Sequence, residues 1–241
     1  MNSESLLIPD WPAPGAVRAL CTTRVGGASK APYDKFNLAA HVGDAPEAVA
    51  KNRARLGILA QLPAEPCWLE QVHGDSVVRA DRRDACADAS YSQHAGEVCA
   101  VLTADCLPVL LCRQDGGAVA AVHAGWRGLL SGVIEQTVQV AGEGEWLAWL
   151  GPAIGPQAFE VGRDVYDAFV AEDAQASAAF VPVRPGHYLA DIYALARLRL
   201  ARVGVEQVYG GQHCTYSDPQ RFYSYRRDGV TGRMASLIWR V

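Results

Sequence analysis

Residues 104–128 read ADCLPVLLCRQDGGAVAAVHAGWRG, and the organisation of the chain follows from this stretch. Two apolar runs, at residues 108–112 and 118–122, flank the turn signal QDGG at residues 114–117. Short apolar runs bounded by turn residues are typical of buried strands. We therefore predict an antiparallel hairpin whose two strands are these runs.

The predicted hairpin brings a cysteine and a histidine together. Cys106 lies just before the first run, and His123 lies just after the second. In an antiparallel hairpin the start of one strand faces the end of the other. We therefore expect Cys106 and His123 at the same edge of the sheet.

A helix is predicted directly after His123. Apolar residues continue with helical spacing at positions 129, 130, 133, 134 and 138. Gly125 and Gly128 at a strand-to-helix turn would expose backbone N–H groups, and Arg127 would add a cation suited to phosphate. The alternative is a tight turn between two packed elements, and the local residues leave both interpretations open.

The composition excludes some classes of protein. Half of the 241 residues are hydrophobic, which is enough for a sizeable core, and the net charge is −4 without a basic run. Nucleic acid and anionic membrane are therefore poor candidates for partners. The first residues lack the pattern of a signal peptide or membrane span. Seven cysteines without a Cys-x-x-Cys pair indicate a reducing cytoplasm and argue against a zinc ribbon.

Other segments alternate between strand-like and helical patterns. We expect strands at residues 19–23, 68–72, 76–80, 98–102, 146–150, 205–209 and 235–239, with 68–72 and 76–80 forming a hairpin. Residues 81–96 are expected to form a loop. Helices are expected at 44–56, with Asp44 as N-cap and Gly57 as stop, and at 164–171 and 191–203. Without repeats or linkers, the sequence predicts a single α+β domain over residues 1–241, with a mixed β-sheet core flanked by helices.

Three residues could form a metal site, because His73, Cys106 and His123 each lie where a strand-like run meets a loop. Imidazoles and a thiolate bind zinc or copper, and three protein ligands leave a position for an activated water. Alternatively the three residues are unrelated and Cys106 is a small core residue. As a further alternative, Cys106 and His123 form the nucleophilic pair of a hydrolase, with Asp105 or Asp75 orienting the histidine.

At these residues the sequence resembles the laccase-domain family, also called the multicopper polyphenol oxidoreductase or YfiH-like family. The matching motifs follow one another in the expected order over most of the chain, and as a set they are highly specific. They are Thr22-Thr23-Arg24 with Gly26-Gly27, Asn37-Leu38, His41-Val42-Gly43-Asp44, Gln71-Val72-His73-Gly74, Ala104-Asp105-Cys106 with Pro108, residues 123–128, Gly151-Pro152 with Ile154-Gly155, and residues 224–228.

The resemblance implies both a fold and an activity. The implied fold is related to that of the cytotoxic necrotizing factor toxins, and zinc would be held by His73, Cys106 and His123, with copper less favoured. Similar proteins phosphorolyse adenosine, inosine, guanosine and methylthioadenosine, and they deaminate adenosine. The implied catalytic residues are Arg24, Cys106 and His123. The nucleoside and phosphate would contact Arg24, Asn37, Gln71, Arg127 and Arg226.

Two other functions stay open from the sequence. One is a cysteine or metal hydrolase that edits peptidoglycan precursors, and the other is a copper oxidase of phenols. Multicopper oxidases use His-x-His pairs, which this chain lacks, so the oxidase ranks last. The chain also lacks the His-x-Glu and Cys-x-x-Cys signature of zinc nucleobase deaminases, so deamination would need a different arrangement. The sequence predicts neither the preferred nucleoside nor the oligomeric state.

Overall fold

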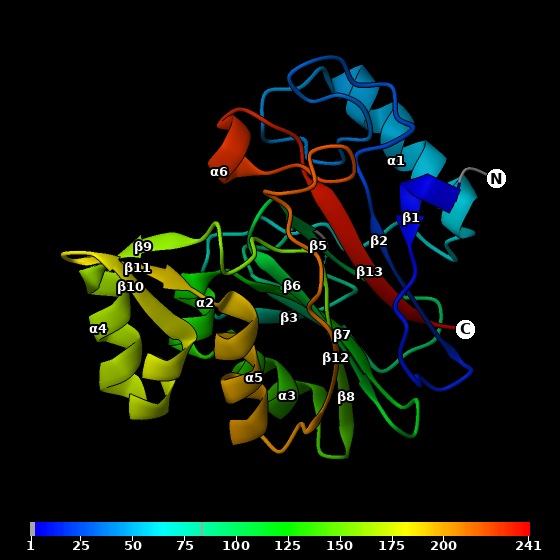
Figure 1. The fold of residues 1–241 in the computed structure, drawn as a ribbon. Helices are drawn as coiled ribbons and strands as arrows, with labels where there is room; N and C mark the ends of the chain where they lie inside the picture. Colours follow the sequence, from blue (N-terminus) through cyan, green and yellow to red (C-terminus); the bar gives the residue numbers. More distant parts are fainter. Residues whose placement is uncertain (1–2, 83) are drawn as a thin grey trace.

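The computed structural model describes residues 3–82 and 84–241, and the strands of that part of the chain form three sheets (Figure 1). The central sheet has the order β12-β8-β6-β7-β4-β3. Its strands are β3 (Val77–Arg79), β4 (Ala89–Ser92), β6 (Leu107–Arg113), β7 (Val119–Ala124), β8 (Trp146–Leu150) and β12 (Gln207–Gly210).

The predicted hairpin is confirmed and lies at the middle of the central sheet. Strands β6 and β7 pair antiparallel, with Leu107 opposite Ala124 and Pro108 opposite His123. Cys106, one residue before β6, therefore lies at the same edge of the sheet as His123. This register places the two side chains together without any contribution from the loop that joins the strands.

A second sheet covers one face of the central sheet. This outer sheet has the order β1-β2-β13-β5, formed by β1 (Leu6–Leu7), β2 (Val17–Thr22), β5 (Val98–Thr103) and β13 (Met234–Arg240). The layer between the sheets contains Leu110 and Cys112 of β6, which share a hydrophobic cluster with Val101 of β5 and Ile238 of β13. All four side chains are fully buried or nearly so.

Helices cover the opposite face of the central sheet (Figure 1). Val109 and Leu111 of β6 belong to the hydrophobic cluster between the central sheet and these helices. Strand β6 is therefore buried on both faces, which explains why its sequence is a continuous apolar run. Helices α2 (Trp126–Ser131) and α3 (Val133–Ala141) replace the single helix expected after His123, because Gly132 between them has a φ of 90°. Helix α5 (Ile192–Arg202) packs on both.

The remaining elements complete the outer layers. Helix α1 (Pro46–Ala60) and the segment around Phe36 and Leu38 cover the outer sheet. A small sheet of order β10-β11-β9 lies with α4 and the 3₁₀ helix η2 beside the helical layer. The elements of this part are β9 (Glu160–Gly162), α4 (Arg163–Glu172), η2 (Ala174–Ala179), β10 (Phe180–Arg184) and β11 (His187–Ala190). Two further short helices are η1 (Ser3–Ser5) and α6 (Tyr225–Asp228).

The predicted fold class, a mixed α+β architecture with helices around a sheet core, is confirmed, but one part of the strand assignment was wrong. Residues 68–72 form no strand. The β-type pairing in and beside this segment consists of two isolated bridges, Cys67–Cys99 and Glu70–Cys86. Strand β3 pairs instead, in parallel, with β4, which lies inside the expected loop 81–96. The small buried side chains of β4, such as Ala89 and Ser90, fit between neighbouring layers but give no periodic signal.

The predicted limits of the first helix were also wrong. Ala45, not Asp44, is the N-cap of α1, and the Asp44 carboxylate accepts a hydrogen bond from Asn37 Nδ2 instead. The helix continues through Gly57 and ends at Gln61, which takes the left-handed conformation with a φ of 49°. The two later helices occur where the sequence predicted them, as α4 and α5. Within the described ranges, every helix is too short or too polar to span a bilayer.

The packing of β6 predicts where the fold is most sensitive to substitution. Leu111 is fully buried, so Leu111→Ala should lower the free energy of unfolding by roughly 2–5 kcal/mol through lost burial and a cavity. Ile58 is 79% exposed on α1, and Ile58→Ala should change it by less than about 0.5 kcal/mol. Urea unfolding measures both variants. An equal loss of unfolding free energy in the two variants would contradict the central position of β6 in the hydrophobic core.

Candidate active site

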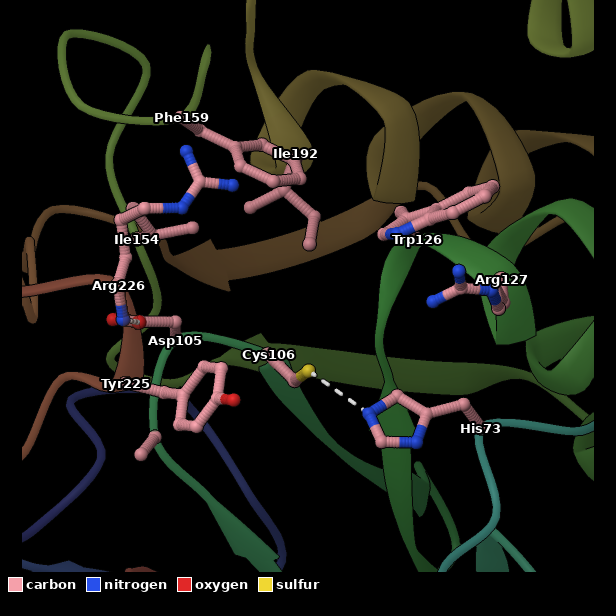
Figure 2. A pocket seen from close by; sticks show the side chains of 11 residues that line it. His73, Asp105, Cys106, Trp126, Arg127, Ile154, Phe159, Ile192, Tyr225 and Arg226 are labelled. Atoms are coloured by element: carbon pink, nitrogen blue, oxygen red, sulfur yellow. Dashed lines mark hydrogen bonds between the residues drawn. The ribbon is translucent and has the colours of Figure 1, made fainter. Parts of the chain in front are cut away.

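Two histidines and a cysteine meet at one end of the central sheet. His123 comes from β7, Cys106 immediately precedes β6, and His73 comes from the loop before β3. One ligand atom from each of the three lies within 4.8 Å of the others. Cys106 Sγ is 3.8 Å from His73 Nε2, as the dashed line in Figure 2 shows. His123 is buried, Cys106 is half-buried and His73 is exposed, so the cluster is open on one side.

A buried aspartate holds both histidines in place. The Asp88 carboxylate accepts hydrogen bonds from the backbone N–H of His73 at 2.9 Å, from that of Gly74 at 2.7 Å, and from His123 Nδ1 at 2.7 Å. The bond to Nδ1 leaves His123 Nε2 free to bind a ligand. Asp105 or Asp75 was expected as the orienting carboxylate of a Cys106–His123 pair, and this was wrong, because His123 bonds Asp88, the residue directly before β4.

The backbone beside the cluster adopts uncommon conformations. His73 has a φ of 64° and Asp105 a φ of 87°, values that non-glycine residues rarely take. Asp105 is anchored by its carboxylate, which accepts from Thr215 Oγ1 and from the Arg226 backbone N–H, both at 2.6 Å. Its carbonyl accepts from the Ile154 N–H at 2.9 Å. Three distant segments therefore converge on the residue that precedes Cys106.

The surroundings stabilise the thiolate form of Cys106. Burial alone would raise the pKa of Cys106, but the charge of His123 and hydrogen bonds with both histidines outweigh it and lower this pKa to about 6. Burial likewise disfavours the charged form of His123, yet Cys106 and Asp88 raise the pKa of this imidazole. A thiolate is the form of cysteine that binds metals and acts as a nucleophile.

The donor set fits a metal ion. Two imidazole nitrogens and a thiolate are ligands that zinc prefers, and the carboxylate behind His123 is the kind of outer partner that metal-binding histidines usually have. The open side of the cluster would leave a coordination position for water or substrate. The same donors also suit copper, so the identity of the metal does not follow from them.

Two cavities meet at the cluster. The aromatic cavity has a volume of about 260 Å³ and is lined by Trp126, Arg127, Ile154, Phe159, Ile192 and Arg226, among others (Figure 2). The basic cavity has a volume of about 400 Å³, and its lining includes His41, Gln71, Thr103, His123 and Arg233. Both cavities are bordered by His73, Ala104, Cys106 and Tyr225, so the cluster lies between them.

Three of the predicted substrate-contacting residues line these cavities. Arg127 lies over the Trp126 ring in the aromatic cavity. Arg226 lies over the Phe159 ring, and its Nη1 donates to the Glu160 carbonyl. Gln71 lines the basic cavity.

The other two predicted residues, and the amide of Gln71, make contacts within the protein. The Gln71 amide bonds both backbone groups of Leu102. The Asn37 side chain is buried and bonds Ala39 and Asp44. The Arg24 guanidinium donates to the carbonyls of Asp34 and Pro219. Neither Asn37 nor Arg24 is among the described residues that line the two cavities.

Four residues of the site were not among the candidates that the sequence suggested. Tyr225 and His41 lay within the quoted motifs, so a resemblance-based signal existed for them. Asp88 lies in a segment that resembled a loop, and Arg233 follows a glycine near the C-terminal strand without any distinctive pattern. Only the pairing of β4 and the position of β13 bring these two residues to the cluster.

Comparisons with known proteins place the chain in a family. The family of multi-copper polyphenol oxidoreductase laccases matches residues 18–241. The chain is 57% identical to the purine nucleoside phosphorylase YfiH of Escherichia coli, over 98% of this chain and 99% of the relative. It is 58% identical to a purine nucleoside phosphorylase of Pseudomonas aeruginosa, over 97% of each chain.

Solved structures show the same fold. A Neisseria meningitidis protein, 51% identical, superposes with a TM-score of 0.95 over 98% of this chain and 99% of its own. YlmD of Geobacillus stearothermophilus, 30% identical, superposes with a TM-score of 0.94 over 100% of this chain and 97% of its own.

The cluster predicts a strict requirement for glycine at position 125. A Cβ there would lie 3.1 Å from Cys106 Sγ and 3.2 Å from His73 Cδ2, so Gly125→Ala should displace both side chains. We expect metal affinity to fall by about tenfold or more, as it does when the support of a ligand is lost. Competition with a coloured chelator measures this affinity.

The matched control is Gly57→Ala. Position 57 has no heavy atom within 4 Å of the added Cβ and lies inside α1, so this variant should keep its metal affinity and gain slight stability. Unchanged metal affinity in Gly125→Ala would contradict the ligand assignment.

Proposed function

The chain belongs to the multi-copper polyphenol oxidoreductase laccase family, and from this we propose that it is a zinc-dependent purine nucleoside phosphorylase. The observation that carries the proposal is the 57% identity, over nearly the whole of both chains, with a relative of that name. The two cavities beside the His73, Cys106 and His123 cluster support it, because the reaction joins two substrates at one centre.

The chemistry of phosphorolysis sets the demands on the site. A phosphate oxygen forms a bond to the sugar C1′ while the bond from C1′ to the purine nitrogen breaks. The electron pair leaves with the purine, which takes up a proton. The site must therefore hold a flat, largely apolar base and a phosphate on opposite sides of one carbon atom.

The aromatic cavity suits the nucleoside. Trp126 and Phe159 offer aromatic faces on which a purine can stack, and Ile154 and Ile192 add apolar walls. Arg226 stacks on Phe159 at the rim and can donate to the base or the sugar. In this arrangement the sugar C1′ lies towards Cys106, where the two cavities meet.

The cluster would hold zinc through His73, Cys106 and His123. Zinc with an open position supplies a Lewis acid that polarises an oxygen or activates water near neutral pH. The remaining task belongs to the protein: Asp88 keeps the two histidines in register by bonding the backbone at His73 and the ring of His123.

We assign adenosine deamination to the same site. In this reaction water adds at C6 of the purine and ammonia leaves, so no phosphate is consumed. The chain lacks the sequence signature of ordinary zinc nucleobase deaminases. One centre serving both reactions requires that the base can lie in the cavity in two positions relative to Cys106.

One observation favours a second candidate, a cysteine hydrolase. In space, the His123 imidazole lies between the Asp88 carboxylate and the Cys106 thiol, which is the arrangement that such enzymes use. Asp88 Oδ1 is 2.7 Å from His123 Nδ1. In that role the sulfur attacks an acyl carbon, for example in a peptidoglycan precursor, and the imidazolium protonates the leaving amine. His73 has no part in this mechanism.

Incubation with a panel of nucleosides tests the proposal. Adenosine, inosine, guanosine and methylthioadenosine should release their free bases only when phosphate is present. Ammonia release from adenosine should not depend on phosphate. Base release from none of the four, with hydrolysis of a peptidoglycan precursor, would favour the second candidate.

Metal content provides the next prediction. The purified protein should carry about one zinc per chain, and Cys106→Ala should lose zinc and phosphorolysis together because a ligand is gone. Elemental analysis and base-release assays on the same preparations measure both. Several coppers per chain would point to the oxidase instead.

Variants of the histidines separate the metal site from a cysteine nucleophile. In the metal interpretation His73→Ala and His123→Ala both lose zinc affinity. In the nucleophile interpretation the protein resists chelators, a thiol alkylator blocks it, and His73→Ala remains active with its metal content unchanged. The second pattern would contradict the proposal.

Arg24→Ala tests the last of the residues implied to be catalytic. The Arg24 guanidinium donates to Asp34 and Pro219, so its loss should lower the free energy of unfolding by about 1.5–3 kcal/mol. We expect the KM for phosphate to stay the same in the folded variant. A fall in phosphorolysis of about ten- to a hundredfold at full stability would instead place Arg24 on a substrate.

A further inference from the structure

Arg233 is fixed at the wall of the basic cavity by its backbone. Its N–H donates to Asn37 Oδ1 at 3.0 Å, and its carbonyl accepts from the Leu38 N–H at 3.4 Å. It stands one residue before β13, the strand that runs through the middle of the outer sheet. The side chain therefore starts from a backbone position that the fold determines.

The guanidinium of Arg233 is only partly satisfied. Its Nη1 donates to the carbonyls of Thr231 and Gly232, but its Nε and Nη2 have no hydrogen-bond partner in the part of the chain that the structure describes. The guanidinium lies over the Tyr225 ring, with Cζ 5.8 Å from the ring centre, but it forms no ion pair with a carboxylate of the described residues, although the side chain is half-buried. By contrast, the buried Arg199 pairs with Glu135 and Glu172.

A half-buried cation without an anionic partner is costly unless an anion joins it. Burial lowers the pKa of Arg233, and the charges of Cys106, Asp105 and Tyr225 oppose this effect without cancelling it. The surroundings are otherwise positive: after burial, the charges of Arg233 and Arg53 are what lower the pKa of His41 in the same cavity. The basic cavity is thus lined by an arginine whose Nε and Nη2 are free to donate to a ligand.

We infer that Arg233 binds the phosphate co-substrate in the basic cavity. The free Nε and Nη2 belong to a planar fork that can donate to two oxygens of a tetrahedral oxyanion. This assignment rests on the proposed phosphorylase function.

The position of Arg233 also suits the direction of the reaction. The aromatic cavity and the basic cavity share Cys106 and His73, so substrates held in them approach one centre from two sides. A phosphate held by Arg233 can attack C1′ from the side opposite the purine. Arg127 and Arg226, implied earlier as phosphate ligands, line the cavity that we assign to the nucleoside.

Arg233→Gln is the decisive variant, and inorganic phosphate is the probe. Isothermal titration of the zinc-loaded full-length protein should show phosphate binding weakened by about ten- to a hundredfold, because charge-assisted hydrogen bonds are lost. In steady-state assays the KM for phosphate should rise by a similar factor, while the KM for inosine should change by less than about twofold. Zinc content and thermal stability are measured on the same samples.

Two further variants provide controls. Arg163→Gln removes the same charge from an exposed arginine paired with Asp167 on α4, and it should leave both KM values unchanged. Arg233→Lys keeps the charge but loses the fork, so it should show an intermediate loss of phosphate affinity. If Arg233→Gln does not fold, Arg233→Lys decides the question alone.

The outcomes separate the inference from the proposed function. Wild-type affinity for phosphate in the Arg233 variants, or an equal loss of affinity for inosine, would overturn the inference even if the protein is a phosphorylase. A wild-type protein that binds phosphate through Arg233 but cleaves no nucleoside would retain the anion site and disprove the phosphorylase.

Discussion

The buried carboxylate of Asp88 is the contact on which the site depends. It joins the loop that carries His73 to the strand that carries His123, through bonds to two backbone amides and one imidazole nitrogen. Although burial alone would raise the pKa of Asp88, these bonds lower it, so the group stays ionised. A buried anion of this kind is stable only while all its donors are present, which ties the cluster to the integrity of β4.

Layered packing explains why the cluster can be open on one side. The central sheet is buried on both faces, between helices and the outer sheet, and this rigid core ends at the turn from β5 to β6. Cys106 lies in that turn, and loops from three other regions close around it through Asp105. The cluster thus lies at the end of the rigid core, and helices and loops together supply the cavity walls.

The two cavities differ in the side chains that line them, and this difference is what a reaction between two unlike substrates requires. One offers aromatic faces and apolar side chains, and the other offers an unpaired guanidinium and a neutral histidine. A purine and a phosphate have matching preferences. Under the proposed function, the metal-compatible cluster at their junction would be the point where a bond between sugar and base is exchanged for a bond between sugar and phosphate.

Local patterns in the sequence were enough to predict the hairpin, the position of Cys106 and His123 at one edge of its sheet, and the helices α4 and α5, because apolar runs and turn residues are local signals. His73 was also a candidate from its place between an apolar run and a loop, and the family motifs supported it, although it lies 33 residues before Cys106. Only the tertiary structure decided that Asp88 orients the histidines and that Arg233 faces the cavity. Both lie on segments whose partners are distant in the chain, and pairing between distant strands leaves no periodic trace in either segment.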